Sequence, residues 1–223
     1  MDQCGLTLCP GNIMASNPEL CLSFGEWQHK FAHIIQLPDP NNLLAASIFF
    51  DIRNLWGNES ALPRLMPYLL SLISDHPQFQ RMMAENALQY RLPLSGVFDR
   101  IGHALGISDN TINLKTEALS PFVDATRILA LAYGISQAST LLRLEQLEHK
   151  GAISREDAHA FQGAYKYLQL LRMQEHLQQS QNQQPLSNTL DPASLNPLER
   201  KILHESIRQA HRLQELLRFK YQL

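Results

Sequence analysis

Two stretches near the end of the chain carry apolar residues at helical spacing, and they constrain the fold more than any other feature. The first starts at Ser154, with Asp157 as its capping partner. Its apolar stripe consists of Phe161, Ala164, Tyr165, Leu168 and Leu171. The stripe of the second consists of Ile202, Leu203, Ile207, Ala210, Leu213 and Leu217. An isolated amphipathic helix is marginally stable in water, so we expect the two stripes to pack against each other.

The start of the second stretch is the clearest helix signal in the chain. Asn196 suits the N-cap, Pro197 suits the first helical position, and Glu199 stands at the third. Between the two stretches, residues 178–195 are rich in Gln and Asn and interrupted by prolines. This composition predicts an exposed connection between the two helices.

Helical periodicity also marks five segments before residue 154. It predicts helices over residues 24–36, 60–74, 77–91, 121–133 and 137–149. Prolines at 38 and 40 end the first helix, and glycines at 134 and 151 end the last two. The sequence therefore predicts a mostly α protein, a helical bundle that begins near residue 60.

Residues 45–52 (AASIFFDI) are the best strand candidate, because they are short, aromatic and β-branched and are followed by Gly57-Asn58. A period of two would place Asp51 and Arg53 on one face of this strand. A small hairpin with arms at 97–98 and 111–114 is a further β candidate. We therefore expect one small β element near residues 45–53 beside the helices.

Composition and charge narrow the class of protein. Hydrophobic residues make up 44% of the 223 residues and charged residues 18%, which is typical of a folded protein and not of a disordered one. A net charge of −2 gives no electrostatic case for nucleic acid or an anionic membrane as a partner. No apolar run has the length of a membrane span, and the first residues do not form a signal peptide. The three cysteines (Cys4, Cys9 and Cys21) form no disulfide framework, so we expect a cytoplasmic protein.

Two groups of residues carry a resemblance to a known family. The first is Cys4-Gly5, residues 9–18 (CPGNIMASNP) and residues 47–53 (SIFFDIR); the second is Leu114-Lys115 and residues 121–127 (PFVDATR). In this order and spacing they resemble the nucleotidyltransferases that commonly follow a cyclic-nucleotide-binding module and a pair of cystathionine-β-synthase-type domains. Those proteins are similar to the bacterial uridylyltransferases that modify the PII signalling protein.

The resemblance implies a division of the chain into two parts. Residues 1–58 would be the C-terminal remnant of a nucleotidyltransferase α/β core, with the small β element left over from its sheet. Residues 59–223 would be the helical substrate-binding domain described for that family. The implied partners are upstream nucleotidyltransferase and regulatory domains of the same protein and a protein acceptor, and the sequence leaves open whether two copies form a homodimer.

The catalytic motifs of such enzymes are missing from this sequence. They open with a Gly-Ser turn that holds the triphosphate and an Asp-x-Asp pair that holds divalent metal. The 223 residues contain neither motif. We therefore assign no catalytic residue to this chain and expect it to be inactive alone, with Mg²⁺ and a nucleoside triphosphate used only by the full-length protein.

Asp51 is the candidate metal ligand. By resemblance it falls where the fold carries an acidic residue on a strand beside the Asp-x-Asp pair. An unpaired carboxylate among Phe49, Phe50 and Ile52 would be costly. The alternative is an ion pair with Arg53 on the same strand face, or with an arginine elsewhere in the chain.

Lys115, Asp124, Arg127 and Arg53 are the candidate nucleotide-binding or substrate-binding residues. In the related uridylyltransferases, a similar lysine and a following helix with aspartate and arginine face the nucleotide cleft. Here Lys115 would lie on an extended segment, and Asp124 and Arg127 would share one side of a helix. Two cations that converge on a cleft suit a triphosphate. The alternative is a structural i,i+3 ion pair between Asp124 and Arg127.

A second function remains compatible with the sequence. It is a non-catalytic module for signal transduction or interaction, coupled to upstream regulatory domains. An all-α DNA-binding protein is disfavoured, because the charge is balanced and no basic recognition helix is present.

Overall fold

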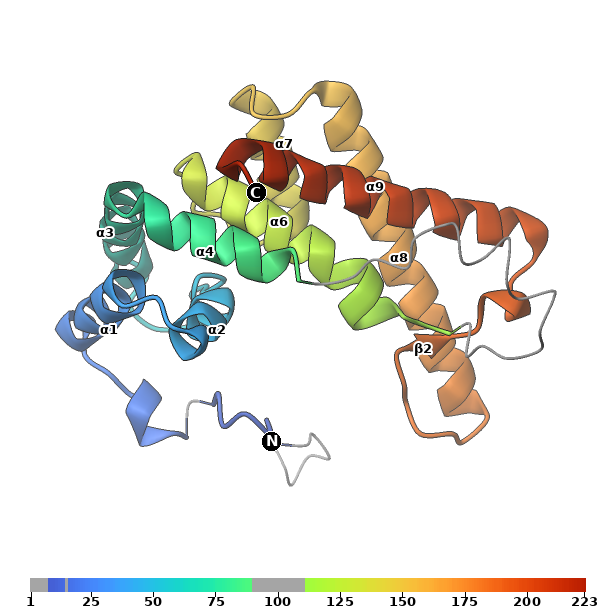
Figure 1. The fold of residues 1–223 in the computed structure, drawn as a ribbon. Helices are drawn as coiled ribbons and strands as arrows, with labels where there is room; N and C mark the ends of the chain where they lie inside the picture. The colour runs from blue at the N-terminus through green and yellow to red at the C-terminus, as the bar shows by residue number, and fades with distance from the viewer. Residues whose placement is uncertain (1–7, 15, 90–110) are drawn as a thin grey trace.

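The computed structural model describes residues 8–14, 16–89 and 111–223, and these residues are mostly helical (Figure 1). Its α-helices are α1 (Phe24–Gln36), α2 (Pro40–Phe49), α3 (Ala61–Asp75), α4 (Pro77–Ala87), α6 (Ser120–Ala132), α7 (Thr140–His149), α8 (Arg155–Gln181) and α9 (Pro197–Tyr221). Three shorter turns are the 3₁₀ helices η2 (Pro18–Leu20) and η4 (Pro192–Ser194) and the π-helix η3 (Leu114–Leu119). Two short strands are β1 (Ile112–Asn113) and β2 (Thr189–Leu190).

Helices α8 and α9 pack against each other along their apolar stripes, as predicted (Figure 1). The hydroxyl of Tyr167 on α8 donates to the carbonyl of Glu199 on α9 at 3.1 Å, and Arg212 forms an ion pair with Asp157. Within the predicted stripe of α9 only Ile202 is exposed, at 39%. The predicted start of α9 is confirmed, because the Asn196 side chain accepts from the backbone N–H groups of residues 198 and 199 in a capping box.

Helix α6 lies at the centre of the bundle and packs against α4, α7, α9 and η3 (Figure 1). Nine of its residues are buried, including Phe122 and Arg127. Gly134, at a φ of 65°, follows the end of α6, and this left-handed conformation is accessible to glycine without steric cost. One hydrophobic cluster extends from Phe31 on α1 to Leu217 on α9, so the helices share a core.

The predicted strand at residues 45–52 is wrong, because most of this stretch belongs to helix α2. Asp39 is the N-cap, and its side chain accepts from the N–H of Asn42 at 2.8 Å, while Pro40 takes the first helical position. Both proline and an acidic cap favour a helix start here. Residues 51–53 follow as a turn and an irregular segment, so Asp51 and Arg53 do not share a strand face.

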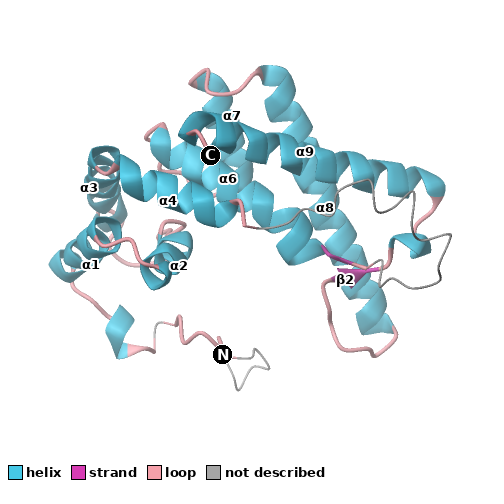
Figure 2. Ribbon diagram, in the orientation of Figure 1, coloured by secondary structure: helices cyan, strands magenta, loops and turns pink. Residues whose placement is uncertain are grey.

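The β element of the described residues lies elsewhere. Ile112 pairs with Leu190 and Asn113 with Thr189 in a two-stranded antiparallel sheet, drawn in magenta in Figure 2. Residues 111–114 thus supply one strand, as the hairpin prediction required, but the partner is the connection between α8 and α9. The other predicted arm, 97–98, lies outside the described residues.

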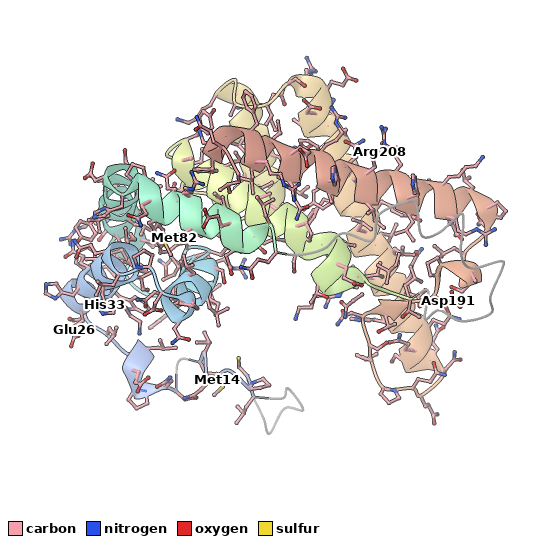
Figure 3. The ribbon with its side chains drawn as sticks, viewed as in Figure 1. Met14, Glu26, His33, Met82, Asp191 and Arg208 are labelled. Carbon is pink, nitrogen blue, oxygen red and sulfur yellow. The ribbon has the colours of Figure 1, made fainter. Side chains whose placement is uncertain are left out.

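The connection between α8 and α9 is shorter and less exposed than predicted. Helix α8 continues to Gln181, so the glutamine-rich start of 178–195 is helical. Leu190, Pro192 and Leu195 are buried, and Asp191 caps η4 beside the sheet (Figure 3). This segment therefore packs against the bundle at its end and is exposed only over residues 182–187 and at scattered positions beyond.

Helix α1 matches its predicted bounds and packs against α2 and α3. Ser23 and Glu26 form a capping box at its start, where Figure 3 shows Glu26. Phe31 contacts the rings of Trp27 and Phe50 with centroids 5.5 and 5.8 Å apart, and so joins α1 to the end of α2. The domain boundary at residues 58 and 59 stays a prediction.

None of the helices in the described ranges combines the length and the apolar character that crossing a membrane requires.

Candidate functional site

A cavity of about 370 Å³ lies where α2, α4, η3, α6 and α8 meet. Its lining residues are Leu43, Leu44, Ser47, Met83, Asn86, Ala87, Lys115, Leu119, Ser120, Val123, Asp124, Arg127, Ile128, Gln169 and Arg172. Three of the predicted binding residues, Lys115, Asp124 and Arg127, therefore line one concavity. The lining contains three cationic side chains and one carboxylate, in addition to apolar groups.

Arg127 is held in place by two carboxylates. Its Nε and Nη2 donate to Asp51 at 3.0 and 2.6 Å, and its Nη1 donates to Asp124 at 2.5 Å. The side chain of Arg127 is only 5% exposed. The bidentate pair with Asp51 joins α6 to the end of α2 across 76 positions of the sequence. Asp124 and Arg127 therefore form the i,i+3 ion pair that was the alternative to ligand binding.

Arg143 on α7 completes this ion-pair network. Its Nη2 donates to Asp51 at 2.5 Å, and the residue is only 1% exposed. Its Nε and Nη1 are buried without a partner in the part of the chain that the structure describes. The sequence did not lead to Arg143. The available signal was its place on the buried face of α7, beside Leu144 and Leu147, where a cation requires an acidic partner.

The pKa shifts in this network follow from burial and ion pairing. Burial raises the pKa of Asp51, but hydrogen bonds and charges from Arg127 and Arg143 outweigh it, and the pKa lies below its ordinary value. Burial raises the pKa of Asp124, and the nearby Arg127 offsets this only in part. Burial lowers the pKa of Arg127, and the two carboxylates reverse that shift. The pKa shifts of Asp51 and Arg127 therefore both favour the charged forms of these two side chains.

Both carboxylate oxygens of Asp51 accept from arginine side chains, which disfavours a magnesium ion at this position in the fold. The described residues hold no group of three His, Cys, Asp or Glu side chains that could bind a metal. The metal role of Asp51 beside an Asp-x-Asp pair stays a prediction. Of the alternatives open for Asp51, the contacts favour an ion pair with arginines elsewhere in the chain. The pair with Arg53 is wrong, since Arg53 is exposed and Asp51 bonds Arg127 and Arg143. Arg53 does not line the cavity.

Lys115 lies on the π-helix η3, and not on an extended segment as predicted. The side chain of Asn113 caps this turn and accepts from the N–H groups of Lys115 and Thr116 at 3.1 and 3.0 Å. Glu117 accepts from the N–H of Asn113 at 2.6 Å. These local bonds explain why the residues after Lys115 form a helical turn and lead directly into α6. π-Helical turns are frequent at functional sites.

Arg172 on α8 also lines the cavity, and the sequence analysis missed it. Its Nε donates to the side-chain oxygen of Asn188 at 2.6 Å. It forms no ion pair with any residue that the structure describes. Arg172 lies outside the apolar stripe of α8, so the sequence did not indicate a role for it. The cavity is formed only when α8 packs against η3.

Comparison with known proteins identifies the family. A family model described as "Putative nucleotidyltransferase substrate binding domain" matches residues 77–221, and one described as "Putative nucleotidyltransferase DUF294" matches residues 1–41. No curated protein and no solved structure gave a significant match to the chain. The first match covers well over half of the 223 residues. The chain therefore belongs to the family described as "Putative nucleotidyltransferase substrate binding domain".

Proposed function

We propose that the cavity between α2, α4, η3, α6 and α8 binds the nucleotide substrate of a nucleotidyl transfer similar to that of the PII uridylyltransferases. The observation that carries the proposal is the convergence of Lys115, Asp124 and Arg127 on this one cavity. Its volume of about 370 Å³ falls within the range of small-molecule sites, roughly 300–1,000 Å³. Its mixture of apolar walls and a few polar groups is also typical of such sites.

The chain contributes binding to this reaction and not its chemical step. In the transfer, an acceptor oxygen bonds to the α-phosphorus of a nucleoside triphosphate, the bond to pyrophosphate breaks, and the acceptor proton passes to a base. A Gly-Ser turn and an Asp-x-Asp pair, which would organise this step with Mg²⁺, are absent from the sequence. We assign them to a nucleotidyltransferase domain of the full-length protein, acting in the cytoplasm on a protein acceptor.

Filling the cavity is expected to weaken nucleotide binding. Ser47 lines the cavity from α2, and the next residue, Ile48, does not. We expect Ser47→Trp to weaken the binding of uridine triphosphate at least tenfold, because an indole would occupy ligand space. The matched control Ile48→Trp places the same group outside the cavity, where the parent side chain is already 39% exposed. Isothermal titration calorimetry of the two variants and the parent measures the difference.

Equal weakening in the two variants, or none in either, would place the nucleotide outside this cavity. Melting curves of both variants must first match the parent, so that a loss of binding is not a loss of folding.

An interaction module without catalysis is the second candidate function. The observation in its favour is the exposed apolar surface after α2, where Leu55 is 81% and Trp56 is 94% exposed. If the parent chain binds no nucleoside triphosphate at millimolar concentration, this second function becomes the better explanation of the cavity and of this exposed surface.

A further inference from the structure

We infer that Lys115 and Arg172 form a phosphate-binding site at the cavity, with Arg127 as its structural support. The inference rests on the proposed function and names the ligand group that the cavity recognises, the phosphate chain of a nucleotide. It assigns a binding role to Arg172, which the sequence did not indicate, and it removes direct phosphate contact from Arg127.

The distribution of acidic partners separates the three cations of the cavity. Arg127 donates to two carboxylates and keeps only 5% of its side chain exposed. Neither Lys115 nor Arg172 forms an ion pair within the described ranges, and both line the cavity. Two uncompensated cations beside one concavity attract an anion, whereas a cation already paired with carboxylates adds little.

The polar contacts of Arg172 leave the outer part of its guanidinium available. Its Nε is bound to the side chain of Asn188 at 2.6 Å, which fixes the plane of the group. No hydrogen bond of Nη1 or Nη2 is formed with a described residue. Those two nitrogens carry four N–H donors in a planar fork, and this geometry matches two oxygens of a phosphate.

Asn188 contacts both of the segments that carry the two cations. Its backbone carbonyl accepts from the N–H of Leu114 at 2.8 Å, the residue before Lys115, and its side chain accepts from Arg172. The short sheet of β1 and β2 continues from these contacts. The connection between α8 and α9 therefore positions Lys115 on η3 and Arg172 on α8 together, so the site is formed before a ligand arrives.

Inorganic tripolyphosphate is the probe that tests this site, because it contains the phosphates of a nucleoside triphosphate without the base or the sugar. We expect the 223-residue chain to bind it with an affinity that falls as salt is added. Lys115→Ala and Arg172→Ala should each weaken binding about ten- to a hundredfold, the effect of losing one charge-assisted contact. The matched control Lys166→Ala, which removes an exposed cation on α8 outside the cavity, should change binding less than about twofold.

Three results would overturn the phosphate site. The first is no tripolyphosphate binding by the parent chain. The second is unchanged binding in both cavity variants. The third is an equal loss in the Lys166→Ala control, which would indicate diffuse charge. Lys115 is exposed and its side chain forms no hydrogen bond or ion pair with a described residue, so its variant tests the site even if Arg172→Ala perturbs Asn188.

A parallel titration with uridine triphosphate and uridine separates this inference from the proposed function. If uridine triphosphate binds, is blocked by Ser47→Trp and is unaffected by Lys115→Ala and Arg172→Ala, the cavity binds nucleotide and the phosphate site is wrong. If tripolyphosphate binding depends on Lys115 and Arg172 but uridine triphosphate binds no more tightly and is insensitive to Ser47→Trp, the phosphate site holds and the nucleotide function fails.

Discussion

Replacing Asp51 with asparagine is expected to lower the free energy of unfolding by about 3 kcal/mol, the low end of the range for breaking a buried ion pair. Asparagine removes the negative charge that faces both Arg127 and Arg143, whose side chains are 5% and 1% exposed. Arg127 would then keep only Asp124 as an acidic partner, and Arg143 would have none among the described residues. We use the low end of that range because the Asp51 side chain is still 28% exposed. Urea denaturation of the variant and the parent measures the difference.

The effect should depend on pH in a defined direction. Because the pKa of Asp51 is lowered in the fold, its carboxylate stabilises the protein above the ordinary aspartate pKa of about 3.9. This stabilisation is lost as the pH falls through the lower folded pKa. The difference between parent and Asp51→Asn should therefore be constant near neutral pH and shrink below about pH 4.

Glu85→Gln is the matched control, since it also converts a carboxylate to an amide. Glu85 pairs with Arg81 on the surface of α4, and their side chains are 49% and 50% exposed. This change should cost less than about 0.5 kcal/mol. Similar costs for the two variants would mean that the network around Asp51 contributes no more than a surface ion pair.

Leu213→Asp is expected to destabilise the protein by about 4 kcal/mol or more, because it removes a buried leucine and places a charge in the hydrophobic core. Leu213 is fully buried on α9. A typical domain has only about 5–15 kcal/mol of stability, so the variant should melt far below the parent or fail to fold. Thermal unfolding followed by circular dichroism measures the change.

The same substitution at Leu198 provides the control. Leu198 lies in the first turn of α9 and is 66% exposed, and an acidic residue is favourable at that end of a helix. We expect its melting temperature to stay close to that of the parent. An unchanged melting temperature for Leu213→Asp would show that the buried face of α9 contributes little to the stability of the bundle.

Local signals in the sequence predicted the helices well where several of them agreed. At α9, the cap, the proline and the apolar stripe all indicate the same start and the same buried face. At α2, two signals conflicted. Residues 47–50 favour a strand by their side chains, whereas Asp39 and Pro40 favour a helix that starts at residue 40. The helix formed, because its cap bonds are made locally and Leu43, Ala46 and Phe50 still reach the core.

The candidate site could be predicted only where its residues are close in sequence. Lys115, Asp124 and Arg127 lie within 13 residues, and the structure brings all three to one cavity. Arg143 and Arg172 were missed, because their partners are distant: Arg143 meets Asp51 across 92 positions, and Arg172 depends on the packing of α8 against η3. No local pattern encodes such contacts.

Hydrogen exchange of the parent chain with saturating uridine triphosphate tests most directly whether the cavity lined by η3, α6 and α8 binds nucleotide. We expect slower backbone exchange in residues 114–127 and 169–172, where the ligand would contact the chain, and unchanged exchange in residues 201–209 on α9. These last residues line a second, mostly apolar groove between α8 and α9. Protection confined to that groove, or no protection at all, would contradict the account.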